Sequence, residues 1–152
     1  PMHVVLFQPE IPPNTGNVAR LCAAMQVSLH LIEPLGFKLE DRYLKRAGLD
    51  YWPHVDMTVW PDLDAYLHGA GKGRRLVLTS ARRGVPLHRF SFAENDALVF
   101  GRETSGLPPE VIALSPHHVR IPIRGEVRSI NLSTAAGIVL FQALVSAGLM
   151  EE

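Results

Sequence analysis

The chain alternates short apolar runs with longer stretches in which apolar residues recur at helical spacing. Runs short enough for single strands occupy residues 4–7, 29–32, 57–60, 76–79, 97–100 and 119–123. Helices are predicted over residues 17–26, 40–47, 62–68, 108–114 and 131–149. Strands that alternate with helices are typical of an α/β domain whose sheet is mostly parallel and flanked by helices. No repeat, linker or low-complexity stretch divides the chain, which predicts a single domain over residues 2–152.

Proline and glycine set several of the predicted boundaries. Residues 12–16 read Pro-Pro-Asn-Thr-Gly, a composition typical of a loop, so the first helix is expected to begin near Asn17. Gly48 is expected to end the second helix. Residues 80–95 are mostly polar and are expected to be irregular. Because Pro122 has no backbone N–H, it marks either an edge strand or the end of the last strand.

The last predicted helix is apolar on nearly every face between residues 135 and 147. A helix that is apolar all round must be buried on all sides. A chain of 152 residues has few elements with which to cover a second face of this helix. A second copy of the chain is the simplest cover, so the pattern predicts a homodimer.

The composition is that of an ordinary globular protein, with 47% hydrophobic and 20% charged residues. No apolar run approaches the roughly 20 residues that a membrane span needs, so no membrane association is expected. The single cysteine, Cys22, lies in an apolar run and is expected to be buried and inert. Residues 1–4 do not resemble the start of a secretion signal. These features together predict a cytoplasmic protein.

The charges are balanced overall but clustered locally. Fifteen basic and fifteen acidic residues give a formal net charge of zero, which argues mildly against nucleic-acid binding. Basic residues nevertheless gather at Lys38, Arg42, Lys45 and Arg46, at Arg74, Arg75, Arg82 and Arg83, and at Arg120, Arg124 and Arg128. Such clusters are either solvated faces or contacts for RNA phosphate, and the composition leaves both readings open.

Loops rich in Gly, Ser, Thr and Asn follow several predicted strands. They occupy residues 14–17, 101–106 and 125–133. In parallel sheets, ligands bind in the loops beyond the carboxyl ends of the strands. The spacing of Gly101 and Gly106 is that of a P-loop, but the Lys-Ser/Thr pair that must follow is absent. His117 and His118 would point to opposite faces of a strand, so neither phosphate-loop nor metal chemistry is indicated.

Three polar groupings are candidates for chemistry, each with an ordinary structural alternative. Asn14 and Arg20 flank the start of the first helix, where an anion can bind, although a structural salt bridge would also explain Arg20. Glu103 lies between two glycines after a buried strand and is either a site residue or a solvated carboxylate. Ser129 and Asn131 open the last helix, where an N-cap is the default explanation.

Taken in order, these segments resemble the three signature motifs of the SPOUT methyltransferases. The motifs are Asn14-Thr15-Gly16-Asn17-Val18-Ala19-Arg20, then Phe100 to Pro108 (FGRETSGLP), then Ile121-Pro122-Ile123 with Ser129-Ile130-Asn131-Leu132-Ser133. Residues 9–17 and 46–51 are similar to one branch, the minimal tRNA (cytidine/uridine 2′-O)-methyltransferases. The resemblance covers essentially the whole chain.

The resemblance implies a fold, a reaction and partners. The fold is a SPOUT-type sheet whose C-terminal part is threaded into a trefoil knot. The reaction is 2′-O-methylation of the wobble nucleotide of tRNA, a cytidine or a 5-carboxymethylaminomethyluridine. S-adenosyl-L-methionine is the methyl donor, S-adenosyl-L-homocysteine is the product, and no metal takes part. The enzyme is a homodimer that binds the anticodon stem-loop of tRNA, and no other protein partner is implied.

The resemblance also implies roles for individual residues. Leu78, Thr79, Gly101, Glu103, Ile121, Ser129 and Leu132 would bind the cofactor, and Arg20, Asn14, Glu103, Ser129 and Asn131 would form the catalytic set. Relatives assign activation of the hydroxyl to the arginine that matches Arg20. A guanidinium keeps its proton above about pH 12, so stabilising the developing alkoxide is the safer role. Arg42, Lys45, Arg46, Arg82 and Arg83 are candidates for contacts with tRNA. Phe141 replaces a tyrosine of some relatives, which indicates dimer packing rather than a hydroxyl function.

Three other functions compete with this interpretation. A SPOUT methyltransferase could act on rRNA or on another tRNA position, which the branch-like segment at residues 9–17 disfavours. A non-catalytic RNA-binding module is disfavoured because Arg20, Glu103, Ser129 and Asn131 are all present. An unrelated nucleotide hydrolase would need a phosphate loop or a metal site, and the sequence offers neither.

Overall fold

The computed structural model describes residues 1–42, 44 and 53–151. In these residues the strands are β1 (His3–Phe7), β2 (Ser28–Ile32), β3 (Met57–Trp60), β4 (Leu76–Thr79), β5 (Val85–Pro86), β6 (Ala97–Phe100) and β7 (His118–Arg120). They form one sheet in the order β3-β2-β1-β6-β4-β7-β5, and every pairing between them is parallel. The helices are α1 (Pro12–Met25), α3 (Leu63–His68), the 3-10 helix η2 (Leu87–Arg89), α4 (Pro109–Ile112) and α5 (Leu132–Ser146). The predicted α/β class with a parallel sheet is confirmed.

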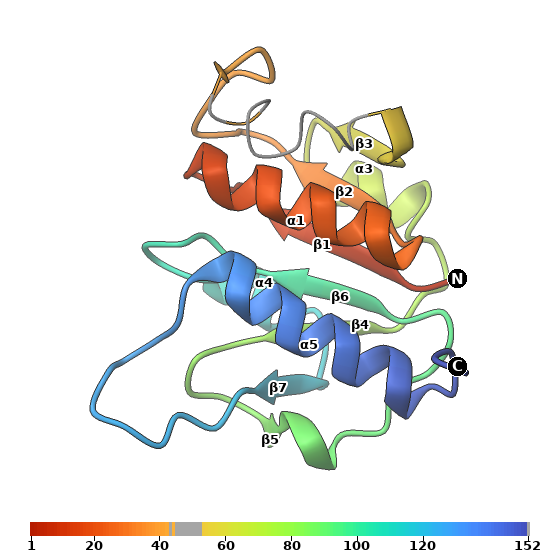
Figure 1. The fold of residues 1–152 in the computed structure, drawn as a ribbon, viewed down its shortest axis with the longest axis vertical. Coiled ribbons are helices and arrows are strands. Elements are labelled where there is room, and N and C mark those ends of the chain that lie inside the picture. Colours follow the sequence, from red (N-terminus) through yellow and green to blue (C-terminus); the bar gives the residue numbers. More distant parts are fainter. Residues whose placement is uncertain (43, 45–52, 152) are drawn as a thin grey trace.

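Helices cover the two faces of the sheet. Helices α1 and α5 lie side by side over one face, as Figure 1 shows. Alternate residues of β1 divide between the faces: Val4 and Leu6 belong to the core under α1 and α5, whereas Val5 and Phe7 pack with α3. Both sets are buried, which explains why the strand reads as a continuous apolar run. None of the described helices is long and apolar enough to span a bilayer.

The predicted loop over residues 12–16 is wrong, because helix α1 begins at Pro12 rather than near Asn17. Proline is tolerated in the first helical turn, where its missing N–H would have no partner within the helix. Asn14 and Gly16 are buried in that turn. Turn-forming residues were therefore overridden by contacts with distant parts of the chain, which hold this segment against the sheet.

The last strand is shorter than predicted, because β7 ends at Arg120 and residues 121–123 lie outside it. Pro122 therefore follows a strand end, and the edge alternative is wrong because β7 lies between β4 and β5. Residues 80–95 are not wholly irregular, since they contain β5 and η2. The predicted helix over residues 40–47 and its stop at Gly48 fall largely on residues 43 and 45–48, outside the described residues. The trefoil knot stays a prediction.

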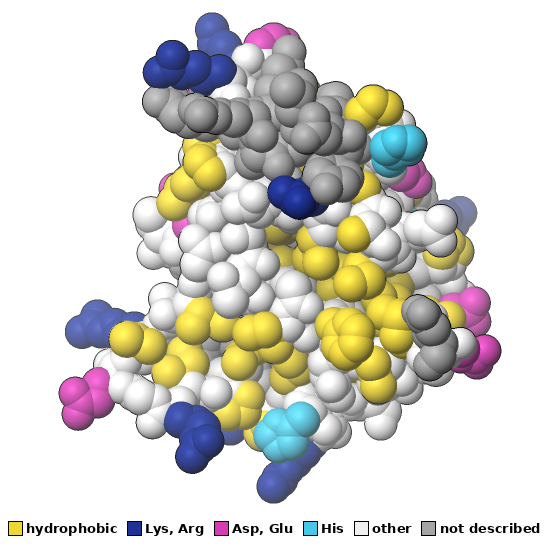
Figure 2. All heavy atoms as spheres, viewed as in Figure 1, with side chains coloured by type: hydrophobic (Ala, Val, Ile, Leu, Met, Phe, Trp, Pro, Cys, Tyr) yellow, Lys and Arg dark blue, Asp and Glu magenta, His cyan; other side chains and the backbone are white. Residues whose placement is uncertain are grey.

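Helix α5 leaves an apolar face uncovered. Ile138, Phe141 and Val145 are 42%, 50% and 48% exposed, and their spacing of three and four residues places them on one side of the helix. Leu140 and Ala143, between them, are fully buried against the sheet. Figure 2 shows hydrophobic side chains gathered on the face of the molecule that carries α5. The expected burial of this helix on all sides is therefore not reached within one chain.

Candidate active site at the carboxyl ends of the strands

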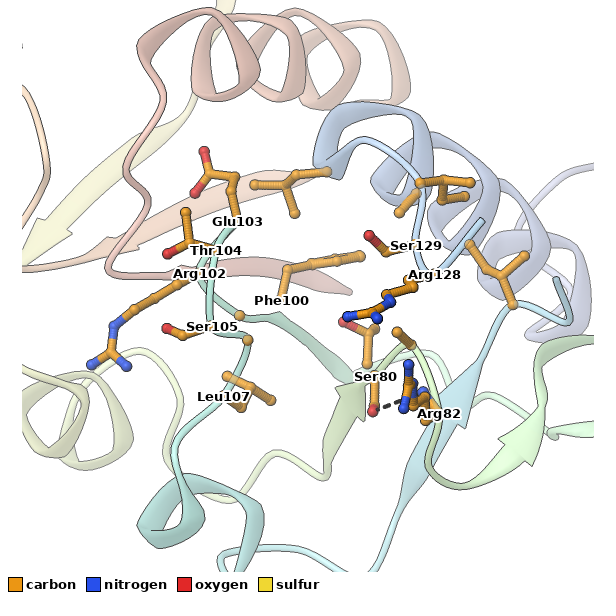
Figure 3. A pocket seen from close by; sticks show the side chains of 18 of the residues that line it. Ser80, Arg82, Phe100, Arg102, Glu103, Thr104, Ser105, Leu107, Arg128 and Ser129 are labelled. Atoms are coloured by element: carbon orange, nitrogen blue, oxygen red, sulfur yellow. Dashed lines mark hydrogen bonds between the residues drawn. The ribbon is translucent and has the colours of Figure 1, made fainter. Parts of the chain in front are cut away.

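A pocket of about 770 Å³ opens at the carboxyl ends of β4, β6 and β7. Figure 3 shows that its walls come from the loops after these strands and from the start of α5. The predicted site residues that line it are Asn14, Thr79, Gly101, Glu103, Ile121, Ser129, Asn131 and Leu132. Because β4 lies between β6 and β7 and all three are parallel, their C-terminal loops meet at one edge of the sheet.

Two predicted site residues do not line the pocket. Leu78 is fully buried within β4, one residue before the lining begins at Thr79. Arg20 is exposed on α1, although its neighbours Val18 and Ala19 are fully buried. The structure therefore brings together every member of the predicted sets except these two.

Residues 101–106 form a tight loop after β6. Arg102 and Gly106 pair across it in an antiparallel bridge. A Cβ at Gly101 would lie 2.4 Å from the carbonyl carbon of Gly106, so only glycine fits there. This close approach of the backbone explains the glycine that the motif requires at position 101.

The carboxylate of Glu103 holds the chain where it enters α1. It accepts hydrogen bonds from the backbone N–H groups of Glu10 and Ile11, both at 2.8 Å, and from Asn14 Nδ2 at 3.4 Å. Glu10 in turn binds the loop after β6, since its carboxylate accepts hydrogen bonds from Thr104 N at 3.0 Å and from Thr104 Oγ1 at 2.8 Å. These bonds, led by the one from the Thr104 backbone N–H, hold the pKa of Glu10 below its ordinary value. Glu103 is therefore an anchor between two loops, and the solvated-carboxylate alternative is wrong.

A hydrogen bond between two asparagines joins the first turns of α1 and α5. Asn131 Nδ2 donates to Asn14 Oδ1 at 3.0 Å. Asn131 Oδ1 also caps α5 by accepting from Ser133 N at 2.9 Å and Thr134 N at 3.4 Å. Asn131 is thus both the N-cap and a lining residue, whereas Ser129 lies in the preceding loop and lines the pocket.

Sequence reasoning missed several lining residues. They include Ser80, Phe100, Arg102, Leu107, Ile123 and Arg128. Arg102 is held in place because its Nε donates to Gln8 Oε1 at 2.8 Å and its guanidinium carbon lies 5.1 Å from the centre of the Phe7 ring. All six lie at strand ends or in the loops after β4, β6 and β7, so their place in the strand-loop pattern was the available signal.

The basic residues proposed from the sequence are dispersed. Arg82 and Arg83 line the pocket, whereas Arg42 is exposed and does not line it. Lys45 and Arg46 lie outside the described residues. Within residues 1–42, 44 and 53–151, no group of three or more His, Cys, Asp or Glu side chains could hold a metal ion.

Comparison with known proteins identifies the family. Residues 1–141 match the SpoU rRNA Methylase family. The chain belongs to this family. Its resemblance to the SPOUT methyltransferases, drawn from the three motifs, is thereby confirmed.

Two relatives are similar to this chain over almost their whole length. The tRNA (cytidine(34)-2′-O)-methyltransferase of Methylovorus glucosotrophus is 46% identical over 142 residues, which cover 92% of each chain. A solved structure described as "Structural insights into the 2-OH methylation of C/U34 on tRNA" is 48% identical, with a TM-score of 0.91 and 95% of each chain covered. The AdoMet-bound rRNA methyltransferase of Sinorhizobium meliloti has a TM-score of 0.88 at 23% identity, covering 99% of this chain and 57% of that one, and shares the fold.

Proposed function

We propose that this protein transfers a methyl group from S-adenosyl-L-methionine to the ribose 2′-oxygen of nucleotide 34, the wobble nucleotide, of tRNA. The observation that carries the proposal is the 46% identity, across 92% of both chains, to a tRNA (cytidine(34)-2′-O)-methyltransferase. Residues 2–152 act as one catalytic domain in this proposal. The pocket after β4, β6 and β7 is its active site.

The pocket fits a nucleoside-sized cofactor. Its volume of about 770 Å³ lies within the usual range for small-molecule sites. Apolar side chains from Phe100, Leu107 and Ile121 suit the faces of an adenine ring, and Thr79 and Ser129 supply polar groups at its edges. S-adenosyl-L-methionine, when bound, supplies a methyl group on a sulfonium sulfur, which a ribose oxygen can displace directly.

The chain's own residues then have three tasks. Glu103, Asn14 and Asn131 hold the two helix starts and the loop after β6 in one geometry, as their mutual hydrogen bonds support. This preorganisation aligns the attacking oxygen with the methyl carbon. Arg20 stabilises the alkoxide that develops as the hydroxyl proton passes to solvent water, because its guanidinium stays charged throughout.

The proposed enzyme acts as a homodimer. The exposed stripe of Ile138, Phe141 and Val145 on α5 supports this, since burying such a stripe against a second copy removes it from water. Arg20 is exposed on α1, which lies beside α5, and it does not line the pocket of its own chain. In the proposed dimer, Arg20 acts on the substrate bound in the partner's pocket.

The test is transfer of labelled methyl from S-adenosyl-L-methionine to unfractionated tRNA. We expect the wild-type protein to yield a 2′-O-methylated nucleotide 34, and Arg20→Ala to lose at least about a hundredfold in rate, the usual loss when a preorganised charge is removed. Arg89→Ala is the matched control, because Arg89 is exposed and lies outside the pocket. Label in rRNA alone would contradict the substrate, and full activity of Arg20→Ala would contradict the role of Arg20.

A further inference from the structure

Two arginines from neighbouring loops meet at the mouth of the pocket. Arg82 follows β4 and Arg128 follows β7, two strands that pair in parallel with Thr79 opposite Val119. Figure 3 shows both side chains on one side of the pocket, across from Glu103 and Arg102. Both are exposed, so they lie at the opening rather than in the depth of the pocket.

Neither arginine is paired with an acidic side chain of the described residues. Among the described residues, neither Arg82 nor Arg128 forms an ion pair; the pairs there are His68 with Asp64 and Arg75 with Asp96. Glu103 supplies the lone carboxylate among the described residues that line the pocket, and it is engaged by backbone N–H groups. Arg83 adds a third positive charge to the lining. This side of the pocket therefore carries an excess of positive charge.

The loop of residues 80–84, which follows β4, is held by backbone contacts rather than by its arginine side chains. Ser80 Oγ accepts hydrogen bonds from the backbone N–H groups of Arg82 and Arg83, both at 3.2 Å. Gly84 presses on β7 so closely that a Cβ there would lie 2.0 Å from the carbonyl oxygen of His118. The backbone thus places the guanidinium of Arg82 at the pocket mouth while leaving its five donors for a ligand.

We infer that Arg82 and Arg128 form a phosphate subsite that receives a phosphodiester of the substrate RNA; the inference rests on the proposed function. The sulfonium of the cofactor is a cation and would be repelled by this pair. Two anions could bind to the arginine pair, the carboxylate of the cofactor or a phosphate of the RNA. The exposed position favours the phosphate, because a nucleotide that enters the pocket leaves its backbone at the opening. Guanidinium groups from two loops also match the two free oxygens of a phosphodiester.

The test compares RNA and cofactor binding in three variants. Arg82→Gln and Arg128→Gln each remove one guanidinium, and Arg89→Gln is the matched control outside the pocket. A fluorescently labelled anticodon stem-loop is titrated at several salt concentrations, and S-adenosyl-L-homocysteine is titrated by calorimetry. We expect each site variant to lower the slope of log affinity against log salt by about 0.7 to 0.9, the value for one lost phosphate contact. We expect each site variant to bind S-adenosyl-L-homocysteine with an affinity within about twofold of wild type. We expect the control to match wild type in both measurements.

Two outcomes would overturn the inference. Weaker binding of S-adenosyl-L-homocysteine with an unchanged salt slope would assign the arginines to the cofactor carboxylate. Unchanged values for both ligands would leave them as solvated side chains. Methyl transfer by the wild-type protein is measured in parallel, so failure of the proposed function shows as no transfer to tRNA, independently of any difference between variants and wild type.

Discussion

Acid should destabilise this protein through two buried histidines, His3 at the start of β1 and His30 in the middle of β2. His3 Nδ1 lies 2.9 Å from Tyr66 Oη, and the rings of His3 and His30 are 4.3 Å apart. Trp60 Nε1 donates to His30 Nδ1 at 3.0 Å, so this nitrogen carries no proton. Protonating His30 would set one N–H against another and place a charge in a site that is 4% exposed. Burial lowers the pKa of His3 to about 3 and that of His30 to about 4.

The size of the effect follows from these values. Both histidines are neutral in the folded protein between about pH 4 and 6.5, whereas in the unfolded chain they titrate near the ordinary value of 6.5. The unfolded state therefore binds more protons in this window, and stability falls as the pH falls. Lowering the pH from about 7 to about 5 should cost about 2 kcal/mol per histidine, or about 4 kcal/mol in all. This is a large share of a typical domain stability of about 5–15 kcal/mol.

Urea unfolding at both pH values measures the loss. His30→Gln should remove about half of it, because a glutamine does not titrate, whereas His68→Gln should leave it unchanged because His68 is exposed. Carboxylates mostly protonate below about pH 5, which keeps their contribution small in this window. Equal losses in wild type and His30→Gln, or no loss in the wild type, would refute the assignment.

Three further predictions address the site and the interface. Phe141→Glu should shift a homodimer to monomer in analytical ultracentrifugation, because it places a charge in the exposed stripe of α5, whereas Leu114→Glu, equally exposed but away from α5, should not. Asn131→Ala should cost about 0.5–2 kcal/mol in the free energy of unfolding through loss of the α5 cap, as should Asp62→Ala at the cap of α3, but only Asn131→Ala should also lower methyl transfer. Glu103→Gln should cost about 1–3 kcal/mol in thermal unfolding, since an amide offers a single acceptor oxygen to two N–H groups; a melting temperature equal to wild type would contradict the anchoring role.

The strands could be predicted from the sequence because the interior of a parallel sheet leaves a local mark. Residues 4–7 and 97–100 are apolar without a break, and both lie buried in the centre of the sheet. The start of α1 has no comparable signal in the local sequence. It depends on Glu103, more than 90 residues away, whose carboxylate accepts the N–H groups of Glu10 and Ile11. Local turn chemistry at Pro12 to Gly16 therefore pointed to a loop.

The candidate site was predicted where motifs named its residues and missed where they did not. Six of the seven predicted cofactor residues line the pocket, because strand ends and tight glycine loops are local features of the sequence. Arg128 was noted only as one of a basic cluster. Its position on the same side of the pocket as Arg82 depends on β4 and β7 being neighbours, and strand order cannot be read from apolar runs.

The hydrogen bonds of the pocket divide its residues into two kinds. Asn14 uses its amide nitrogen on Glu103 and its amide oxygen on Asn131, so replacing any of the three releases contacts in two segments at once. Substitutions at these three residues should therefore lower stability and methyl transfer together. In double variants, the combined effect should differ from the sum of the two single effects. Arg82 and Arg128 hold no such contacts through their side chains among the described residues. Loss of RNA binding at an unchanged melting temperature is therefore expected at these two arginines, and this separation makes them the sharper probes of how the substrate is bound.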